Sequence, residues 1–166
     1  LAALEDAVQG NQPIIFETGS EEEYLRAHKL AAEYGIDPWF RGSGQEYRII
    51  DVLEGRTDPL IIPLSFPDAP EVGDPESALN ATLADLRDWY LAPTSPAQLA
   101  DAGIRFAITS SGLSSLNEFL PNLRIAVARG LSTSDALAAL TTTPAALLGL
   151  ENTHGTIEEG RVCPVY

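Results

Sequence analysis

Residues 13–35 read PIIFETGSEEEYLRAHKLAAEYG, and this stretch sets the pattern of the whole chain. A short apolar run is followed by Ser20 and, three residues later, Glu23, which is the spacing of a capping box at the start of a helix. Leucine and alanine then recur at helical spacing as far as Gly35, a residue type that commonly ends helices. The stretch therefore predicts a short strand followed by a helix.

The same order recurs three more times along the chain. Further apolar runs stand at 36–40, 60–64 and 104–108. Ser43 and Glu46 have the spacing of a second capping box, and Ser95 precedes a proline that suits the first turn of a helix. Helices are predicted from these caps and at 79–90, 116–129, 134–140 and 144–148, with a long loop at 65–76.

Four strand–helix units in a row predict an α/β fold. Short, continuous apolar strands are typical of a parallel sheet that is covered by helices. The unit spacing fits either a doubly wound sheet or half of an eight-stranded barrel, and the periodicity does not choose between them. Pro63 is unusual for a central strand because it lacks a backbone donor. The tail 155–162 alternates and turns at Glu-Gly, which predicts strand–turn–strand.

Composition narrows the class of protein. The chain has 166 residues, of which 45% are hydrophobic, and no apolar run of the roughly 18–20 residues that a membrane helix needs, so we expect one soluble domain. A net charge of −14 argues against nucleic acid and membrane as partners. Cys163 is the single cysteine, and we interpret it as an inert thiol. Because the chain begins at Leu1 and contains no methionine, we expect a fragment of a longer parent of unknown localisation.

The C-terminal stretch AALTTTPAALLGL, residues 138–150, followed by GTIEEGR at 155–161, resembles the closing signature of the metal-dependent amidohydrolases. Residues 102–112 and 122–132 resemble the last barrel strand and its helix, and 13–53 resembles the fifth and sixth units of imidazolonepropionase-like members. Residues 63–67 and 86–93 resemble the degenerate first unit of bacterial tandem amidohydrolases. The resemblance implies a partial TIM-type (βα) barrel, with its C-terminal half at 1–150 and the start of a flanking β-sandwich at 151–166.

The resemblance also implies where chemistry should lie. In such barrels the site is at the carboxyl ends of the strands, where the fifth and sixth strands end in histidine and the eighth in aspartate to hold a divalent metal such as zinc. Glu17, Arg41 and Ser111 stand at the equivalent positions here. One carboxylate without imidazole partners makes a poor transition-metal site, and Arg41 would repel a cation. We therefore expect no metal in this fragment.

Other candidate residues are weaker. His28 lies in the middle of a predicted helix and His154 lies in a turn, so we interpret both as structural. Arg41 with Gly42, Ser43 and Gly44 opens a helix after a strand and could hold an anion on backbone amides. Ser110 and Ser111 lack both the sequence of a nucleophile elbow and a placed histidine, which argues against a serine hydrolase.

Three functions follow as hypotheses. The first is a non-catalytic amidohydrolase-like half-barrel that serves as a scaffold or interaction unit. The second is part of an active hydrolase of C–N bonds in a cyclic amide or dipeptide-like substrate, with Glu17 or the loop 65–76 in a variant site. The third is an anion-binding α/β module. A half-barrel would expose strand edges and an apolar inner face, so we expect it to pair with the missing N-terminal half or with a second copy.

Overall fold

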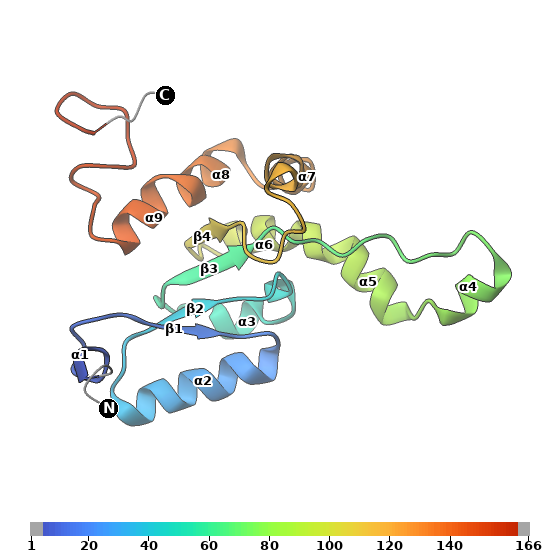
Figure 1. Cartoon of the computed structure of the whole chain (residues 1–166), viewed down its shortest axis with the longest axis horizontal. Helices are drawn as coiled ribbons and strands as arrows, with labels where there is room; N and C mark the ends of the chain where they lie inside the picture. Colours follow the sequence, from blue (N-terminus) through green and yellow to red (C-terminus); the bar gives the residue numbers. More distant parts are fainter. Residues whose placement is uncertain (1–4, 163–166) are drawn as a thin grey trace.

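The structure is a computed structural model that describes residues 5–162. Cys163 and the prediction made for it lie outside the described residues. A four-stranded parallel sheet forms the centre of the molecule, in the order β1-β2-β3-β4 (Figure 1). The strands are β1 (Ile14–Glu17), β2 (Pro38–Arg41), β3 (Leu60–Pro63) and β4 (Phe106–Thr109), and each begins within two residues of its predicted position.

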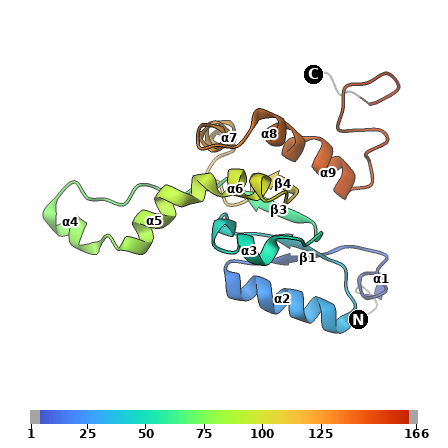
Figure 2. The same ribbon diagram turned by 180° about the vertical axis from the view of Figure 1, so that it is seen from behind.

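The strand order decides between the two predicted architectures. A doubly wound sheet reverses its strand order at a switch point, whereas here each strand adds beside the previous one. Right-handed crossovers that always advance in one direction place all of the helices on one side. Accordingly, α3 (Ile50–Leu53) and α6 (Ser95–Asp101) lie behind the sheet in Figure 1 and in front of it in Figure 2. The four units form a partial TIM-type barrel, and the doubly wound alternative is wrong.

The core lies between the sheet and these helices. Successive side chains of a strand point to opposite faces, and Phe40, Leu60, Ile62 and Phe106 point toward the helices, where they are at most 4% exposed. The Tyr24 ring packs on Phe40 with the ring centroids 4.5 Å apart. Burying such side chains contributes roughly 1.5–3 kcal/mol each, so this outer face supplies most of the stability of the sheet.

The opposite face of the sheet is exposed at β1 and more covered toward β4, where Ala107 is buried. Ile15, whose strand neighbours point toward the helices, is 51% exposed. In a closed barrel this face would be filled by side chains from all of the strands. Pro63 is the last residue of β3 and pairs in register with Thr109, so its missing N–H falls at the end of the ladder rather than inside it. The proline is thus compatible with a central strand.

The caps predicted for the helix after β1 are confirmed, with one change. Helix α2 (Glu21–Tyr34) follows Ser20, whose side chain accepts a hydrogen bond from the Glu23 amide, and ends at Gly35 with φ +63°. The Glu23 carboxylate accepts from the Gly19 amide at 2.6 Å rather than from the amide of Ser20. The helix therefore begins where the sequence predicts, with the reciprocal bond moved by one residue.

The segment between β3 and β4 differs from its prediction. A helix predicted at 79–90 is two helices, α4 (Pro75–Asn80) and α5 (Leu83–Leu91), because Thr82 and Asp85 form a capping box that starts a new helix. Ser95 does not cap α6. It is the first residue of that helix, and its hydroxyl accepts from the Tyr47 amide at 3.1 Å.

The C-terminal helices follow β4 closely. They are α7 (Phe119–Ala128), α8 (Thr133–Leu140) and α9 (Thr142–Leu147), and α8 is capped by Ser132 rather than beginning at 134. The strand–turn–strand predicted at 155–162 is wrong, because the described residues 148–162 contain turns and bends but no strand. A lone two-stranded hairpin is marginal in water, and among the described residues the tail does not pair with the four-stranded sheet. The domain division at residue 150 stays a prediction.

No helix among residues 5–162 is both long and apolar enough to cross a membrane. Four short elements complete the described chain: α1 (Glu5–Val8) and the 3-10 helices η2 (Glu46–Arg48), η3 (Ala92–Thr94) and η4 (Leu116–Glu118).

Candidate functional site

The carboxyl ends of the four strands meet at one edge of the sheet. A cavity of about 390 Å³ lies there, lined by the residues that follow the strands, among them Glu17, Arg41, Pro63 and Ser111. Glu17 and Arg41 are register partners at the ends of β1 and β2. The structure therefore brings together all three side chains that the sequence predicts at the equivalent of the metal site.

Arg41 joins the other two side chains. Its Nη2 lies 2.8 Å from a carboxylate oxygen of Glu17, and its Nη1 donates to the Ser111 hydroxyl at 2.8 Å. The Ser111 amide in turn donates to the Thr109 hydroxyl at 3.2 Å. A guanidinium keeps its charge at every accessible pH, so a fixed positive group stands between the strand ends.

The two histidines lie away from these strand ends. His28 is on α2, where its ring stacks on Phe40 with centroids 6.3 Å apart and its Nε2 lies 3.6 Å from a carboxylate oxygen of Asp58. His154 lies in the turn after α9, where its Nδ1 is 2.8 Å from the Thr153 hydroxyl. Across residues 5–162, no three histidine, cysteine, aspartate or glutamate side chains cluster in a way that could hold a metal ion.

The turn at Gly42–Gly44 binds an anion supplied by the chain itself. The Ser43 and Gly44 amides donate to Oε1 of Glu46 at 2.7 and 3.0 Å. Burial raises the pKa of the Glu46 carboxyl above its usual range, against the lowering effect of these amides. The anion site stays a prediction, with the added condition that an external anion must displace this carboxylate.

The sequence predicts one contact of Glu46, but it does not predict that Glu46 is buried. The Ser43–Glu46 spacing predicts that the glutamate reaches back to the serine amide, and it does. The Ser43 hydroxyl, however, accepts from the Gln45 amide at 3.3 Å, and a 3-10 helix forms instead of a long helix. A capping-box pattern does not reveal whether its glutamate is exposed or buried, so the burial of Glu46 could not be predicted.

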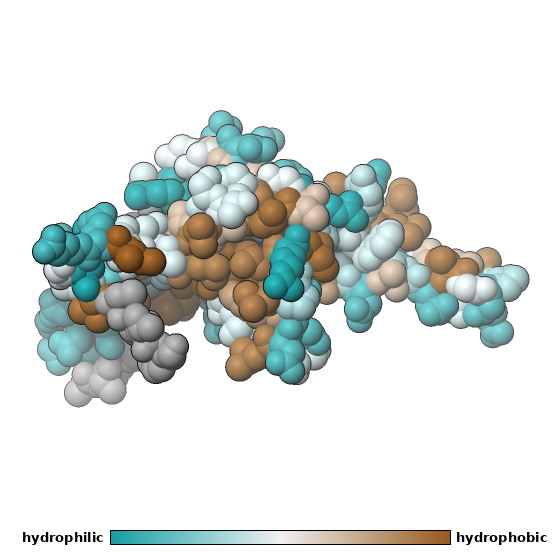
Figure 3. All heavy atoms as spheres, turned by 90° about the horizontal axis from the view of Figure 1, so that it is seen from above, coloured by the Kyte–Doolittle hydropathy of each residue, from teal (hydrophilic) through white to brown (hydrophobic). Residues whose placement is uncertain are grey.

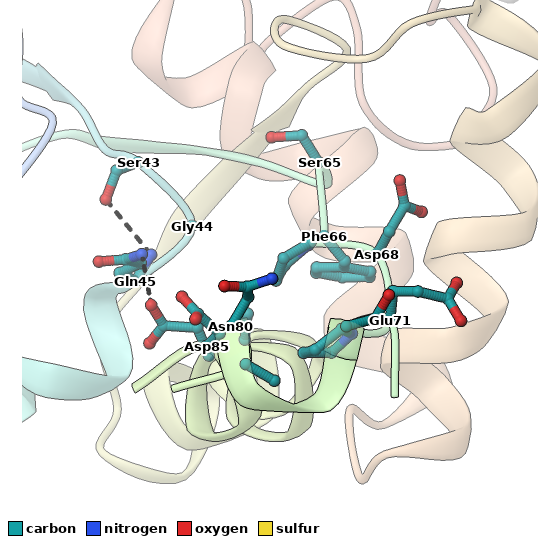
Figure 4. Close-up of a pocket in the computed structure, with 15 residues that line it drawn as sticks. Ser43, Gly44, Gln45, Ser65, Phe66, Asp68, Glu71, Asn80 and Asp85 are labelled. Carbon is teal, nitrogen blue, oxygen red and sulfur yellow. Dashed lines mark hydrogen bonds between the residues drawn. The ribbon is translucent and has the colours of Figure 1, made fainter. Parts of the chain in front are cut away.

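A second and larger pocket lies beside the strand ends, under the projecting α4–α5 segment. Its volume is about 650 Å³ (Figure 4). Figure 4 shows three segments around it: the turn with Ser43 and Gln45, the loop with Phe66, Asp68 and Glu71, and the helices that carry Asn80 and Asp85. The loop 65–76, predicted to be functional on length alone, thus forms a wall of a pocket.

Asp88 anchors α5 to the body of the protein beside this pocket. Its carboxylate accepts from the Gln45 side chain at 3.2 Å and also contacts the Tyr47 hydroxyl and the Arg48 guanidinium. Hydrogen bonding to a carboxylate also affects its partner: burial, followed by the bond to Asp88, raises the pKa of the Tyr47 hydroxyl. This cluster could not be predicted from the sequence, because Asp88 lies about 40 residues from its partners Gln45, Tyr47 and Arg48.

Comparison with known proteins finds similarity to one family in the C-terminal part of the chain. Residues 94–162 match the model of the amidohydrolase family. This part of the chain is an amidohydrolase-family segment. The fold is similar to that of an amidohydrolase from Thermotoga maritima, with a TM-score of 0.71 and 24% identity over 95% of this chain and 38% of that one.

A second solved structure, of an uncharacterized protein, is similar with a TM-score of 0.60 and 19% identity, over 97% of this chain and 40% of that one. None of the curated proteins matches the chain. The amidohydrolase-like chain thus spans about two fifths of the length of the structures it resembles, as expected of a part of a larger fold.

Proposed function

We propose that this amidohydrolase-like unit is a non-catalytic half-barrel that serves as a scaffold or interaction unit within a longer protein. The contact of Arg41 with both Glu17 and Ser111 supports the proposal most directly. These three side chains occupy the positions where the family resemblance implies two histidines and an aspartate. An internal cation and its counter-ion therefore take the place of an external metal.

Electrostatics favours this interpretation. Two unit charges 4 Å apart repel by about 4 kcal/mol at the effective dielectric constant of a protein surface, and a divalent ion doubles that figure. Glu17 offers little compensation because its carboxylate already pairs with Arg41. Oxygen ligands without imidazole also suit zinc poorly. We infer that no divalent metal binds at these strand ends, and that none is needed as a cofactor.

The open face of the sheet supports an assembly role. Among residues 5–162, strands β1 and β4 each pair on one side only, and Ile15 of β1 is half exposed. Unpaired edges and apolar faces favour association. The missing N-terminal half of the barrel is the partner that would close both edges, and a second copy is the alternative.

Metal analysis and activity assays on the full-length protein test the proposal. Metal content is compared between the wild type and Glu17→Ala, and hydrolysis is assayed with cyclic amides and dipeptide-like compounds. We expect neither metal content nor hydrolysis to depend on Glu17. Stoichiometric metal that is lost in Glu17→Ala would overturn the proposal.

A part in an active hydrolase of C–N bonds is the second candidate, favoured by the pocket of about 650 Å³ beside the strand ends. Its loop and helices bring the carboxylates of Asp68, Glu71 and Asp85 to one cavity. Hydrolysis by the full-length protein that persists after removal of any second amidohydrolase unit, and that falls in Asp68→Asn, would favour this candidate over the first.

A further inference from the structure

A separate cavity of about 330 Å³ lies between the first turn of α2 and the segment η2–α3. It adjoins the strand-end cavity around Arg41 and the pocket under α4–α5, and it shares Ser43 with both. Its volume is at the lower end of the roughly 300–1,000 Å³ typical of small-molecule sites. The cavity can therefore accommodate a small ligand or the end of a side chain.

Glu46, a buried acidic residue, is among the residues that line this cavity. The residue is 4% exposed, and its Oε1 accepts from the amides of Ser43 and Gly44. Its Oε2 is also buried but has no hydrogen-bond partner among residues 5–162. A buried carboxylate oxygen without a donor is destabilising, so this atom is an unsatisfied polar group beside the cavity.

The backbone makes room for that carboxyl. A Cβ at Gly42 would overlap with Oε1 of Glu46. Glycine at this position is thus what allows the carboxyl to sit against the turn. The placement of the acid is specific, because both the amides and the missing side chain select it.

The surrounding charges favour a cation. Glu21 and Glu22 lie at the exposed start of α2 and line the same cavity. Arg48 lines it too, but its guanidinium is bound to Asp88. Because the described residues contain no cluster of three metal-ligating side chains, a bare metal ion is disfavoured and an organic cation is favoured.

Part of the lining is apolar, beside polar residues that include Thr18, Ser20 and Gln45. Tyr24, Ile49 and Leu53 contribute to the wall and are each at most 7% exposed. A ligand that pairs with Glu46 while contacting these side chains must carry a positive donor on a hydrocarbon stem. We propose that this cavity binds a primary alkylammonium group, with its N–H donors directed to Oε2 of Glu46. The group would come from a free amine or from a lysine side chain.

Titration of the protein with n-butylammonium chloride tests the site, followed by calorimetry and by the amide resonances of Ser43 and Gly44. We expect saturable binding that shifts those two amides. In Glu46→Gln the amide oxygen can still accept from the turn, but a donor replaces Oε2, so binding should weaken at least tenfold. Glu33→Gln, on the exposed part of α2, is the matched control and should bind like the wild type.

Two further measurements test whether the binding depends on positive charge and on the acidic residues of α2. The neutral analogue 1-butanol should bind at least tenfold more weakly than the amine. The double variant Glu21→Gln, Glu22→Gln, which alters exposed residues only, should weaken amine binding two- to fivefold even where Glu46→Gln fails to fold. Nα-acetyl-lysine amide distinguishes the two sources: equal or tighter binding than butylammonium indicates a lysine, and weaker binding indicates a free amine. Absence of saturable amine binding, or equal binding by 1-butanol, would overturn the proposal.

Discussion

Arg41 shows how far single residues could be predicted. The sequence places Glu17, Arg41 and Ser111 at strand ends, and the parallel sheet then brings them together as expected. The contacts among them could not be predicted, because a strand end does not specify the direction of a long side chain. Glu46 illustrates the same limit, since the sequence gives its distance from Ser43 but not its burial.

The first residue-scale prediction concerns Gly42. In Gly42→Ala the new methyl group would overlap the Glu46 carboxyl, so we expect a loss of about 1–3 kcal/mol in the free energy of unfolding. Urea denaturation followed by circular dichroism measures this loss. Gly19→Ala is the control, because its Cβ would approach only the Glu23 carboxylate, an exposed and flexible group, at 3.1 Å. Equal stability of the two variants would show that the Glu46 carboxyl is not fixed in this position.

The second residue-scale prediction concerns pH. Burial raises the pKa of Glu46 above 4.5 in the folded state, so the folded protein binds a proton more tightly than the unfolded chain. The stability from this residue is complete below pH 4.5 and is lost as the pH rises through the folded-state pKa. We expect Glu46→Gln to remove this loss and to be more stable relative to the wild type at neutral pH than at pH 4.

Urea denaturation of both proteins across pH 4–8 measures the difference. The pKa values of Asp74 and Asp85 are lowered below 3.8 by hydrogen bonds from Ser77 and from Thr82, respectively. Their contributions to stability therefore change with pH mainly in more acid solution, outside this range of pH. A stability difference between wild type and Glu46→Gln that does not vary with pH above 4.5 would contradict the assignment.

At the scale of elements, strands and helix caps were the most predictable features. The four strands and α2 follow from apolar runs and from the Ser20 cap. The break between α4 and α5 was missed because Thr82 lies inside a pattern that also fits one continuous helix, and only the capping box in the structure shows where the chain restarts. Neither α4 nor α5 contains a buried residue, so this segment is held to the body of the protein mainly by the contacts of Asp88.

The element-scale prediction concerns local unfolding of α4 and α5. We expect the amides of residues 75–91 to exchange with deuterium faster than those of α6, whose Ala97 and Leu99 are buried. Loss of the cap in Thr82→Ala should speed exchange in α5 further, by an amount equivalent to about 1 kcal/mol, and leave α6 unchanged. Hydrogen exchange read by mass spectrometry measures both. Protection of α5 equal to that of α6 would contradict this account of the segment.

At the scale of the whole molecule, the periodicity of the sequence fits two folds, and the resemblance of the C-terminal signature favours the partial barrel. Four strand–helix units fit two folds, and the sequential strand order identifies the partial barrel. The tail could not be predicted in the same way, because an alternating sequence does not show whether a segment has a strand to pair with. Figure 3 shows hydrophobic side chains gathered over the middle of the face viewed from above, and exposed apolar residues of α7 and α8 include Leu120, Ile125 and Leu137.

The whole-molecule prediction concerns association. Open edges at β1 and β4 and the exposed apolar side chains should drive the isolated chain to pair with a copy of itself. Static light scattering over increasing concentration should give a mass above the 17.8 kDa of the monomer. Addition of the N-terminal half of the barrel should replace the self-associated form by a mixed complex. A monodisperse monomer at high concentration would contradict the prediction.

The proposed loss of catalysis rests on Arg41 taking the place of a metal between the strand ends. Elemental analysis of the full-length protein, purified without chelators, tests this most directly when wild type and Glu17→Ala are compared. We predict the same content of zinc and of other divalent metals in both proteins, because Glu17 serves Arg41 rather than a metal. One equivalent of metal in the wild type that is absent from Glu17→Ala would contradict it.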